Sequence, residues 1–196
     1  MVFRILLFKT FNRIETWRGL EQHVGRVGWG DYRFEDYRAA LDAVAARGPI
    51  YSPAYVIPPP KLGEESKRSN HLRLLERVMG DGLAAITAGA TELRPIYERL
   101  SSYPSIGPFL AFQFTIDLNY SSLTGAGEDS FVVAGPGARD GIRKCFGRAA
   151  DGIEAEVIRY MTDSQEQHFE RLGLVFGGLF GRSRSPGVGR LRRVPG

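Results

Sequence analysis

The stretch that decides the fold runs from Tyr103 to Ser122 and reads YPSIGPFLAFQFTIDLNYSS. It opens with two prolines close to a glycine, a composition that predicts a tight turn. The residues that follow are mostly apolar, which indicates a helix buried on most of its sides. Polar residues then gather at its end, at Asp117, Asn119 and Tyr120. The sequence therefore predicts a sharp turn leading directly into a core helix with a polar carboxyl end.

The turn resembles the helix-hairpin-helix element of DNA-binding proteins. A helix carrying Leu100 leads into it, and Pro108 can occupy the first turn of the next helix without losing a donor. In such an element the N–H groups of the turn bind a DNA phosphate, here those of Ser105, Ile106 and Gly107. Ser105 stands where the motif usually has glycine. A Pro-x-x-Gly turn is also a common structural connection, so the turn alone leaves both interpretations open.

Helical spacing of apolar residues extends along most of the chain and predicts an all-α fold. Phe3, Leu7, Phe11, Ile14 and Trp17 recur at steps of three and four, as one buried helix face requires. Residues 34–44 show the same spacing before a Gly-Pro stop. Only residues 130–134 favour a strand, and a capping pair at positions 163 and 166 predicts the start of a last helix. We expect one helical domain over residues 1–180.

The excess of positive over negative charge comes from a tail, residues 181–196, which holds five arginines and no acid. Without the tail the chain has 21 basic and 22 acidic side chains, so its pI of 9.4 says little about the body. Glycine, proline, serine and arginine predict a flexible, solvated segment. Any DNA-binding site in the body must therefore be a local patch.

Composition also narrows the class of protein. One cysteine, Cys145, excludes a disulfide framework, and His71 with two other histidines forms no metal-binding pattern. No run is long enough to cross a membrane, and the amino-terminal residues carry no cleavable leader. We expect a cytoplasmic monomer without metal or cofactor.

The order of residues after the turn resembles helix-hairpin-helix DNA glycosylases. In that family an aspartate follows the hairpin after a buried helix and a loop, and Asp129 comes 22 residues after Gly107. Breaking an N-glycosidic bond builds positive charge on the sugar, which a carboxylate can stabilise. Bifunctional members have a lysine two residues after the hairpin's last glycine, where this chain has Phe109. The resemblance implies a monofunctional enzyme that leaves an abasic site. Without the hairpin, Asp129 beside Glu128 is an ordinary loop acid.

Five blocks extend the resemblance to a narrower group. They are FNRIETW (11–17), YSPAYVIPPP (51–60), NHLRLLERVM (70–79), PSIGPFLAFQFTIDLNYS (104–121) and FVVAGPGARDGIRKCF (131–146). Together they resemble the alpha-glutamyl/putrescinyl thymine pyrophosphorylase family and the helical domain of hydroxymethyluracil DNA kinases. The resemblance covers residues 3–150 and implies a protein that handles a modified base in double-stranded DNA.

An extruded base needs hydrogen-bond partners on its edges and an aromatic ring to stack on. The expected base pocket consists of Gln113, Asn119 and Tyr120 with Tyr51, Tyr55, Glu15 and Asn70, and the candidate catalytic acids are Asp117 and Asp129. Further phosphate contacts are expected from Gly135 and Gly137 in a Gly-Pro-Gly turn, and from Arg13 and Lys144. The structural alternatives are that Asp117 caps the following turn and that Asn70 caps a helix or tethers a loop.

Three functions fit this pattern. The first is a glycosylase that excises a modified, phage-derived base in antiviral defence, which the absence of a kinase domain in the chain favours. The second is a transferase that elaborates a modified pyrimidine in phage DNA. The third is a reader of modified DNA that performs no chemistry. The sequence does not identify the base or its decoration.

Deleting residues 182–196 should weaken non-specific DNA binding, because it removes arginines that can bind phosphates. For every phosphate that the shortened protein no longer neutralises, the slope of log K against log salt should fall by about 0.9. Fluorescence anisotropy of an unmodified duplex over a range of salt concentrations measures both quantities. Circular dichroism should show an unchanged helical fold. An unaltered salt slope would contradict the assignment of the tail as an electrostatic contact.

Overall fold

The computed structural model describes residues 1–54, 57–128, 131–175 and 192–193 of the chain. The predicted all-α fold is confirmed, and a pair of two-residue strands is the sole sheet in this described part. Contacts divide the chain into two compact units, Met1–Gly125 and Ala126–Gly196. The expected domain over residues 1–180 spans both units and stays a prediction.

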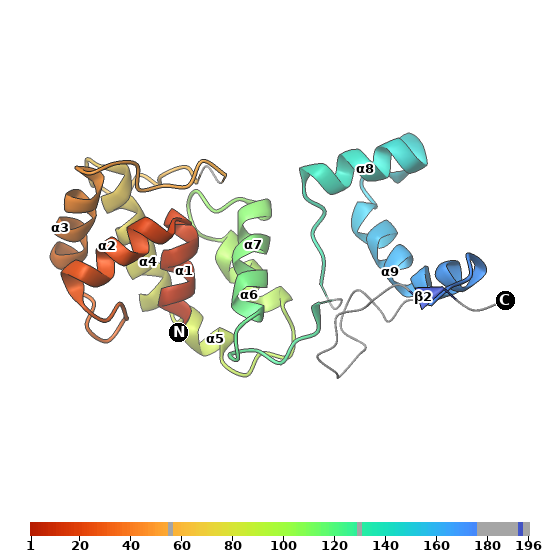
Figure 1. The fold of residues 1–196 in the computed structure, drawn as a ribbon, viewed down its shortest axis with the longest axis horizontal. Coiled ribbons are helices and arrows are strands. Elements are labelled where there is room, and N and C mark those ends of the chain that lie inside the picture. The colour runs from red at the N-terminus through yellow and green to blue at the C-terminus, as the bar shows by residue number, and fades with distance from the viewer. Residues whose placement is uncertain (55–56, 129–130, 176–191, 194–196) are drawn as a thin grey trace. The chain divides into compact units, whose positions relative to one another are not determined.

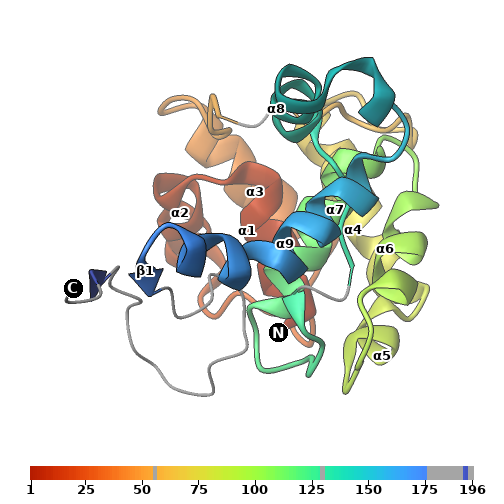
Figure 2. The ribbon, with the colours of Figure 1, turned by 90° about the vertical axis from the view of Figure 1, so that its right-hand side faces the viewer.

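Seven helices form the first unit in its described residues (Figures 1 and 2). They are α1 (Val2–Phe11), α2 (Ile14–Val24), α3 (Phe34–Ala45), α4 (Lys67–Gly80), α5 (Leu83–Thr87), α6 (Arg94–Ser101) and α7 (Pro108–Asn119). Helix α2 packs on α3, α6 packs on α7, and α1 contacts α4, α5 and α7. Figure 1 shows α1 near the middle of this unit.

The amino-terminal residues form two helices, so the prediction of one continuous helix from Phe3 to Trp17 is wrong. Asn12 ends α1 in the left-handed conformation, with φ 49° and ψ 40°. Its N–H donates to the carbonyl of Phe8 at 2.6 Å. Asparagine tolerates this conformation better than most residues, and one such residue is enough to redirect the chain. Ile14, placed on the predicted buried face, is consequently exposed.

The core of the first unit forms where α1, α4 and α7 meet. Phe3, Leu6 and Leu7 of α1 are almost completely buried. They belong to one cluster with side chains of α4 and α7 that include Leu72, Leu75, Ala111, Phe114 and Leu118. Helix α7 has four buried residues, its other residues from Leu110 to Asn119 are half-buried, and Phe109 at its start is 44% exposed. The helix is therefore covered on most of its sides beyond its first turn, as the sequence predicts.

The proline-rich segment before α4 is fixed by one amide side chain. The Oδ1 atom of Asn70 accepts the N–H groups of Leu62 and Glu64 at 2.8 and 3.3 Å. Its Nδ2 atom donates to the carbonyls of Glu64 and Ser66 at 2.7 and 3.0 Å. Ser66 also caps α4 by accepting the N–H group of Ser69. The structure thus supports the loop-tethering alternative for Asn70.

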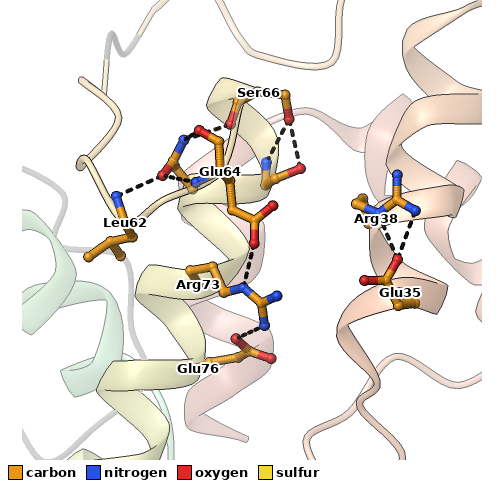
Figure 3. Close-up of polar contacts among 9 residues, drawn as sticks. Glu35, Arg38, Leu62, Glu64, Ser66, Arg73 and Glu76 are labelled. Carbon is orange, nitrogen blue, oxygen red and sulfur yellow. Dashed lines mark hydrogen bonds and ion pairs between the residues drawn. The ribbon is translucent and has the colours of Figure 1, made fainter.

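A charged network holds the same segment to the face of α4 (Figure 3). Arg73 donates to Glu64 at 2.8 Å and to Glu76 at 2.9 Å, so it lies between the two carboxylates. Its guanidinium carbon also lies 3.3 Å from the ring centroid of Phe34 in α3. The loop, α3 and α4 are therefore tied together through one arginine.

The second unit consists, in its described residues, of α8 (Pro136–Phe146), a short 3₁₀ helix η2 (Gly147–Ala150), α9 (Glu154–Arg171) and strands β1 (Leu174–Val175) and β2 (Arg192–Arg193). The strands pair antiparallel, Leu174 with Arg193 and Val175 with Arg192. The strand predicted at 130–134 is absent over its described residues, 131–134. The predicted start of the last helix at residue 163 is also wrong, because α9 begins nine residues earlier.

Helices α2 and α3 approach each other closely at Gly19. A Cβ atom at this position would overlap the Cγ2 methyl group of Val44. Glycine at the centre of a helix is normally unfavourable, so its presence here is explained by this close packing.

Gly19→Ala should lower the free energy of unfolding by about 1–2 kcal/mol, because the new methyl group overpacks the interface. Urea denaturation measures the change. Gly141→Ala in α8 is the matched control: its Cβ would meet no atom, and alanine is the better helix former, so a slight gain is expected. Adding Val44→Ala to Gly19→Ala should recover part of the loss. A Gly19→Ala protein as stable as the wild type would contradict the packing argument.

Candidate functional site

The turn between α6 and α7 has the backbone of a glycine turn although serine occupies it. Ser105 has φ 65°, in the left-handed region that glycine adopts most easily. Gly107 then precedes α7 with φ −74° and ψ 172°, and Pro108 takes the first helical position. Within the described part of the chain no side chain caps α7. Its first N–H groups therefore have no side-chain cap, and phosphate binding at a helix start uses N–H groups of this kind.

One of the three predicted phosphate contacts is already engaged in the turn. The N–H group of Ile106 donates to the carbonyl of Tyr103 at 3.2 Å, and the Ile106 side chain is buried. Ile106 therefore stabilises the turn, which is a correction of its predicted role. Phosphate binding by Ser105 and Gly107 stays a prediction.

The start of α8 repeats this geometry in the second unit. Gly135 has φ −73° and ψ 172°, Pro136 follows at the first helical position, and the described residues offer no side-chain cap. Gly137 lies in the first turn of the helix. Lys144, further along α8, forms an ion pair with Asp140 at 2.7 Å on an exposed surface.

A cavity of about 550 Å³ opens between α1, α2 and the end of α7, and we call it the α1–α7 cavity. It is lined by Met1, Arg4, Ile5, Phe8, Lys9, Asn12, Trp17, Asp117, Tyr120 and Ser121. The α1 residues among them are spaced by three and four, so they form one face of that helix. Helix α1 therefore packs one face into the core and presents the other to the cavity.

An ion pair forms the polar part of the α1–α7 cavity. The Nζ atom of Lys9 lies 2.8 Å from Oδ2 of Asp117, and the two side chains are 12% and 29% exposed. Asp117 is the one candidate catalytic acid whose side chain the structure describes, because Asp129 lies outside the described residues.

Aromatic rings form the wall of the cavity. The ring of Trp17 meets that of Phe8 edge to face at 5.8 Å between centroids. The guanidinium of Arg4 lies 4.8 Å from the Trp17 ring centroid and donates to the carbonyl of Val27 at 2.6 Å. Tyr120 is 70% exposed at the end of α7. The cavity thus combines stacking surfaces with a cation and an anion, the groups that recognise a nucleobase.

The hairpin and the cavity lie along one face of α7. Phe109, Gln113 and Asp117 are spaced by four residues and so follow the same side of the helix. At ~1.5 Å per residue, Asp117 lies ~12 Å along the axis from the first turn. Gln113 lies between the two features and is half-buried, outside the residues that line the cavity.

The other described residues of the predicted pocket are not among those that line the α1–α7 cavity. Asn119 accepts a hydrogen bond from the hydroxyl of Thr124 in the following loop. Arg13 and Glu15 approach each other at 3.2 Å beside the break between α1 and α2, and Glu15 is largely exposed. Tyr55 lies outside the described residues. Among the described residues of the predicted set, Asp117 and Tyr120 line the α1–α7 cavity together.

Tyr51 has no open face for a base. Phe11 stacks on its ring at 5.0 Å with an interplanar angle of 27°, and the ammonium of Lys67 lies 4.3 Å from the ring centroid. Its hydroxyl donates to Nδ1 of His71 at 2.9 Å, since Nε2 of His71 faces the Pro58 carbonyl at 3.4 Å. Tyr51 therefore packs the proline-rich segment onto the core, which corrects its predicted stacking role.

His71 is fully buried, and burial lowers its pKa to about 4, an effect that nearby Lys67 reinforces and the hydrogen bond to Pro58 opposes. Burial likewise raises the pKa of the Tyr51 hydroxyl. Both groups are therefore neutral at pH 7 and act as a hydrogen-bonded part of the core.

Sequence reasoning missed Lys9, Arg4 and Phe8 as site residues. The signal was the two charges in the otherwise apolar run MVFRILLFK, because Lys9 lies four residues after Ile5 and Arg4 lies four residues before Phe8. Charged residues spaced in this way on a largely apolar helix indicate a second, functional face. The partner, Asp117, is 108 residues away, so the pair itself is not visible in the sequence.

Two classes of feature are not found among the residues that the structure describes. No three His, Cys, Asp or Glu side chains come together as a metal-binding group. None of the described helices combines the length and apolar character needed to cross a bilayer.

Comparison with known proteins gives one match. The family described as 5-hmdU DNA kinase, helical domain, matches residues 1–189, and the chain belongs to this family. No curated protein and no solved structure matches the chain. The predicted relation to the helical domain of these kinases is confirmed. The relations to the pyrophosphorylases and to helix-hairpin-helix glycosylases stay predictions.

The free energy of unfolding should fall as the pH is lowered from about 6.5 towards 4 because of His71. The unfolded state binds a proton near its ordinary pKa of about 6.5, whereas buried His71 stays neutral down to about 4, so protonation favours unfolding in this window. The slope should approach 1.4 kcal/mol per pH unit at most. Urea denaturation at several pH values measures it. His71→Leu should flatten the slope, whereas His168→Leu, at an exposed position, should not. Equal slopes in both variants would contradict the assignment to His71.

Proposed function

We propose, because the chain belongs to the 5-hmdU DNA kinase helical-domain family, that it binds DNA containing a modified base and receives that base in the α1–α7 cavity. The family description names kinases that act on 5-hmdU, a modified uracil nucleoside, in DNA. In this protein the reaction is cleavage of the N-glycosidic bond, which leaves an abasic site.

The Lys9–Asp117 ion pair at the polar part of an aromatic-walled cavity carries this proposal. Cleavage of the bond between base and sugar leaves positive charge on the sugar ring. The Asp117 carboxylate, which pairs with the Lys9 ammonium at 2.8 Å, stabilises that charge as it develops. Trp17 and Phe8 offer apolar surface for the extruded base, and the exposed ring of Tyr120 can close over it.

The hairpin supplies a second point of attachment. Uncapped N–H groups at the start of α7 can hold a backbone phosphate ~12 Å along the helix from Asp117. A nucleotide rotated out of a duplex extends from its phosphate into the enzyme, so one contact at each end suits an extruded base. The cavity volume of about 550 Å³ lies in the range of small-molecule sites and leaves room for a base with a substituent. Excision of a base that a phage uses to disguise its DNA would act in defence.

Family membership also supports a second function, transfer of a group onto a modified pyrimidine. A DNA kinase acts on a base that stays attached to the sugar. In this reaction the same cavity would hold the base, and Asp117 would accept a proton from the group that attacks the base substituent.

Product analysis separates these functions. The protein is incubated with duplex DNA containing 5-hydroxymethyluracil and with modified phage DNA, and products are identified by mass spectrometry. Release of a free base supports excision. A heavier nucleoside in intact DNA supports transfer, and tight binding without any product indicates a reader of modified DNA.

Asp117→Asn should preserve folding and most DNA affinity but reduce turnover by about 10²–10⁴-fold, because only the transition state needs the charge. Single-turnover base release and fluorescence anisotropy measure the two effects. Asp163→Asn, on the exposed surface of α9, is the control and should behave as the wild type. Near-normal turnover in Asp117→Asn, with turnover lost in Asp129→Asn, would move the catalytic role to Asp129.

A further inference from the structure

We infer that the protein forms a symmetric dimer in which a groove between α8 and α9 binds the same groove of a second copy of this chain. The groove belongs to the second unit alone, so the dimer does not depend on any reaction in the α1–α7 cavity. The sequence predicts a monomer, and the surface of this unit gives a different expectation.

The α8–α9 groove is an apolar surface to which each of the two helices contributes one face (Figure 1). It has a volume of about 460 Å³. On each helix the lining positions recur at steps of three and four residues, so they form one continuous side. The large apolar side chains and the thiol that line it are Ile142, Cys145 and Phe146 of α8, and Ile158, Met161 and Phe169 of α9.

These helices lack the burial that an apolar helix face acquires in a core. None of the 18 residues of α9, all of which the structure describes, is buried. Phe146 and Met161 line the groove, yet they are 51% and 50% exposed. Apolar side chains that gather in one groove and stay half in water mark a surface that another molecule covers.

The charges beside the α8–α9 groove indicate that this molecule is a second copy. Arg139 and Arg143 each directly follow a groove residue of α8, and Glu166 and Glu170 each directly follow a groove residue of α9. All four are exposed, and the members of each pair are four residues apart. Helix α8 therefore has a basic edge and α9 an acidic edge beside the same groove.

A surface with one basic and one acidic edge is complementary to itself. When two copies meet groove to groove, with α8 of one copy against α9 of the other, a basic edge faces an acidic edge twice, as two-fold symmetry requires. A nucleic acid would meet the acidic edge of α9, which disfavours it.

The length of the groove also suits a second pair of the same helices. Helix α9 is ~27 Å long and α8 ~16 Å long at ~1.5 Å per residue. A second copy brings helices of the same two lengths, so each apolar face is covered along its whole length. The four helices then share one apolar core, as the helices of a bundle do.

Sedimentation equilibrium of the full chain tests the dimer. The mass should rise from 21.8 kDa towards twice that value as the protein concentration increases over roughly 1–100 μM, a range that suits an interface of modest size.

Met161→Lys should weaken self-association by about 30-fold or more, because the dimer would enclose an ammonium group that one copy leaves half in water. Tyr160→Lys is the matched control. It adds the same charge at the neighbouring position of α9, which is 67% exposed and does not line the groove, so the dimer should persist. Circular dichroism should show the helical fold in both variants.

Reversing the charge of one edge tests the symmetry. The double variants Arg139→Glu/Arg143→Glu and Glu166→Arg/Glu170→Arg should each self-associate less than the wild type, because edges of like charge then meet twice. An equimolar mixture of the two variants should recover the dimer, because both contacts of the mixed dimer again join opposite charges. A mixture that stays as weak as its components would contradict the proposed pairing of α8 with α9.

Alkylation of Cys145 in the wild type tests the groove without any substitution. Cys145 is the single cysteine of the chain, lines the groove and is exposed in one copy. Its rate of reaction with a small maleimide should fall as the protein concentration passes through the range of dimerisation, because the second copy covers the thiol.

The other possible occupants of the groove give different results. A mass of 21.8 kDa at every concentration would overturn the inference. In such a monomer, slow alkylation of Cys145 would mean that another segment of the chain covers the groove. Protection of Cys145 that appears only with added DNA would assign the groove to nucleic acid. A dimer that persists in Met161→Lys, with alkylation independent of concentration, would form through another surface and would also overturn the inference.

Discussion

The contact between α1 and α7 is the constraint on which the first unit depends. Phe3, Leu6 and Leu7 fill the core on one face of α1, and this packing fixes the opposite face against the end of α7. Lys9 therefore reaches Asp117 from a helix that the core holds in place. The break at Asn12 adds α2 as a third wall of the α1–α7 cavity, beside α1 and the end of α7. It turns the chain so that Trp17 of α2 meets Phe8 of α1. Core packing and site geometry are consequently set by the same helix.

Several residues that carry the family resemblance hold the structure together. Asn70 satisfies the backbone of the proline-rich segment, and Tyr51 is enclosed between Phe11 and Lys67 above a buried, neutral His71. A segment rich in proline cannot form regular backbone hydrogen bonds, so side chains must fix it. Asparagine, tyrosine and histidine side chains can form hydrogen bonds to a nucleobase, and they can equally bind the polar groups of a buried loop. Only their contacts in the structure distinguish these two roles.

Excision and transfer place the same demands on the α1–α7 cavity. Both require an extruded pyrimidine, a surface on which it stacks and a carboxylate that can handle charge or a proton. The two reactions differ in the bond that reacts, at the sugar for excision and at the base substituent for transfer. In the two proposed reactions the same helical domain would hold the base, and the depth of the base in the cavity would decide which atom meets the Lys9–Asp117 pair.

The sequence by itself determined the helical class, the turn before Pro108 and a helix over residues 34–44, whereas Asp117 as a site residue stays a prediction. These depend on local composition and on spacing along one helix, which short-range physics controls. Only the tertiary structure decided that Asn12 ends α1 and that Lys9 pairs with Asp117. The sequence predicted a site without lysine because Phe109 occupies the single position after the turn at which the hairpin motif can carry one. A folded chain can deliver the same group from a helix more than a hundred residues away, and packing between helices, not sequence order, decides which side chains meet.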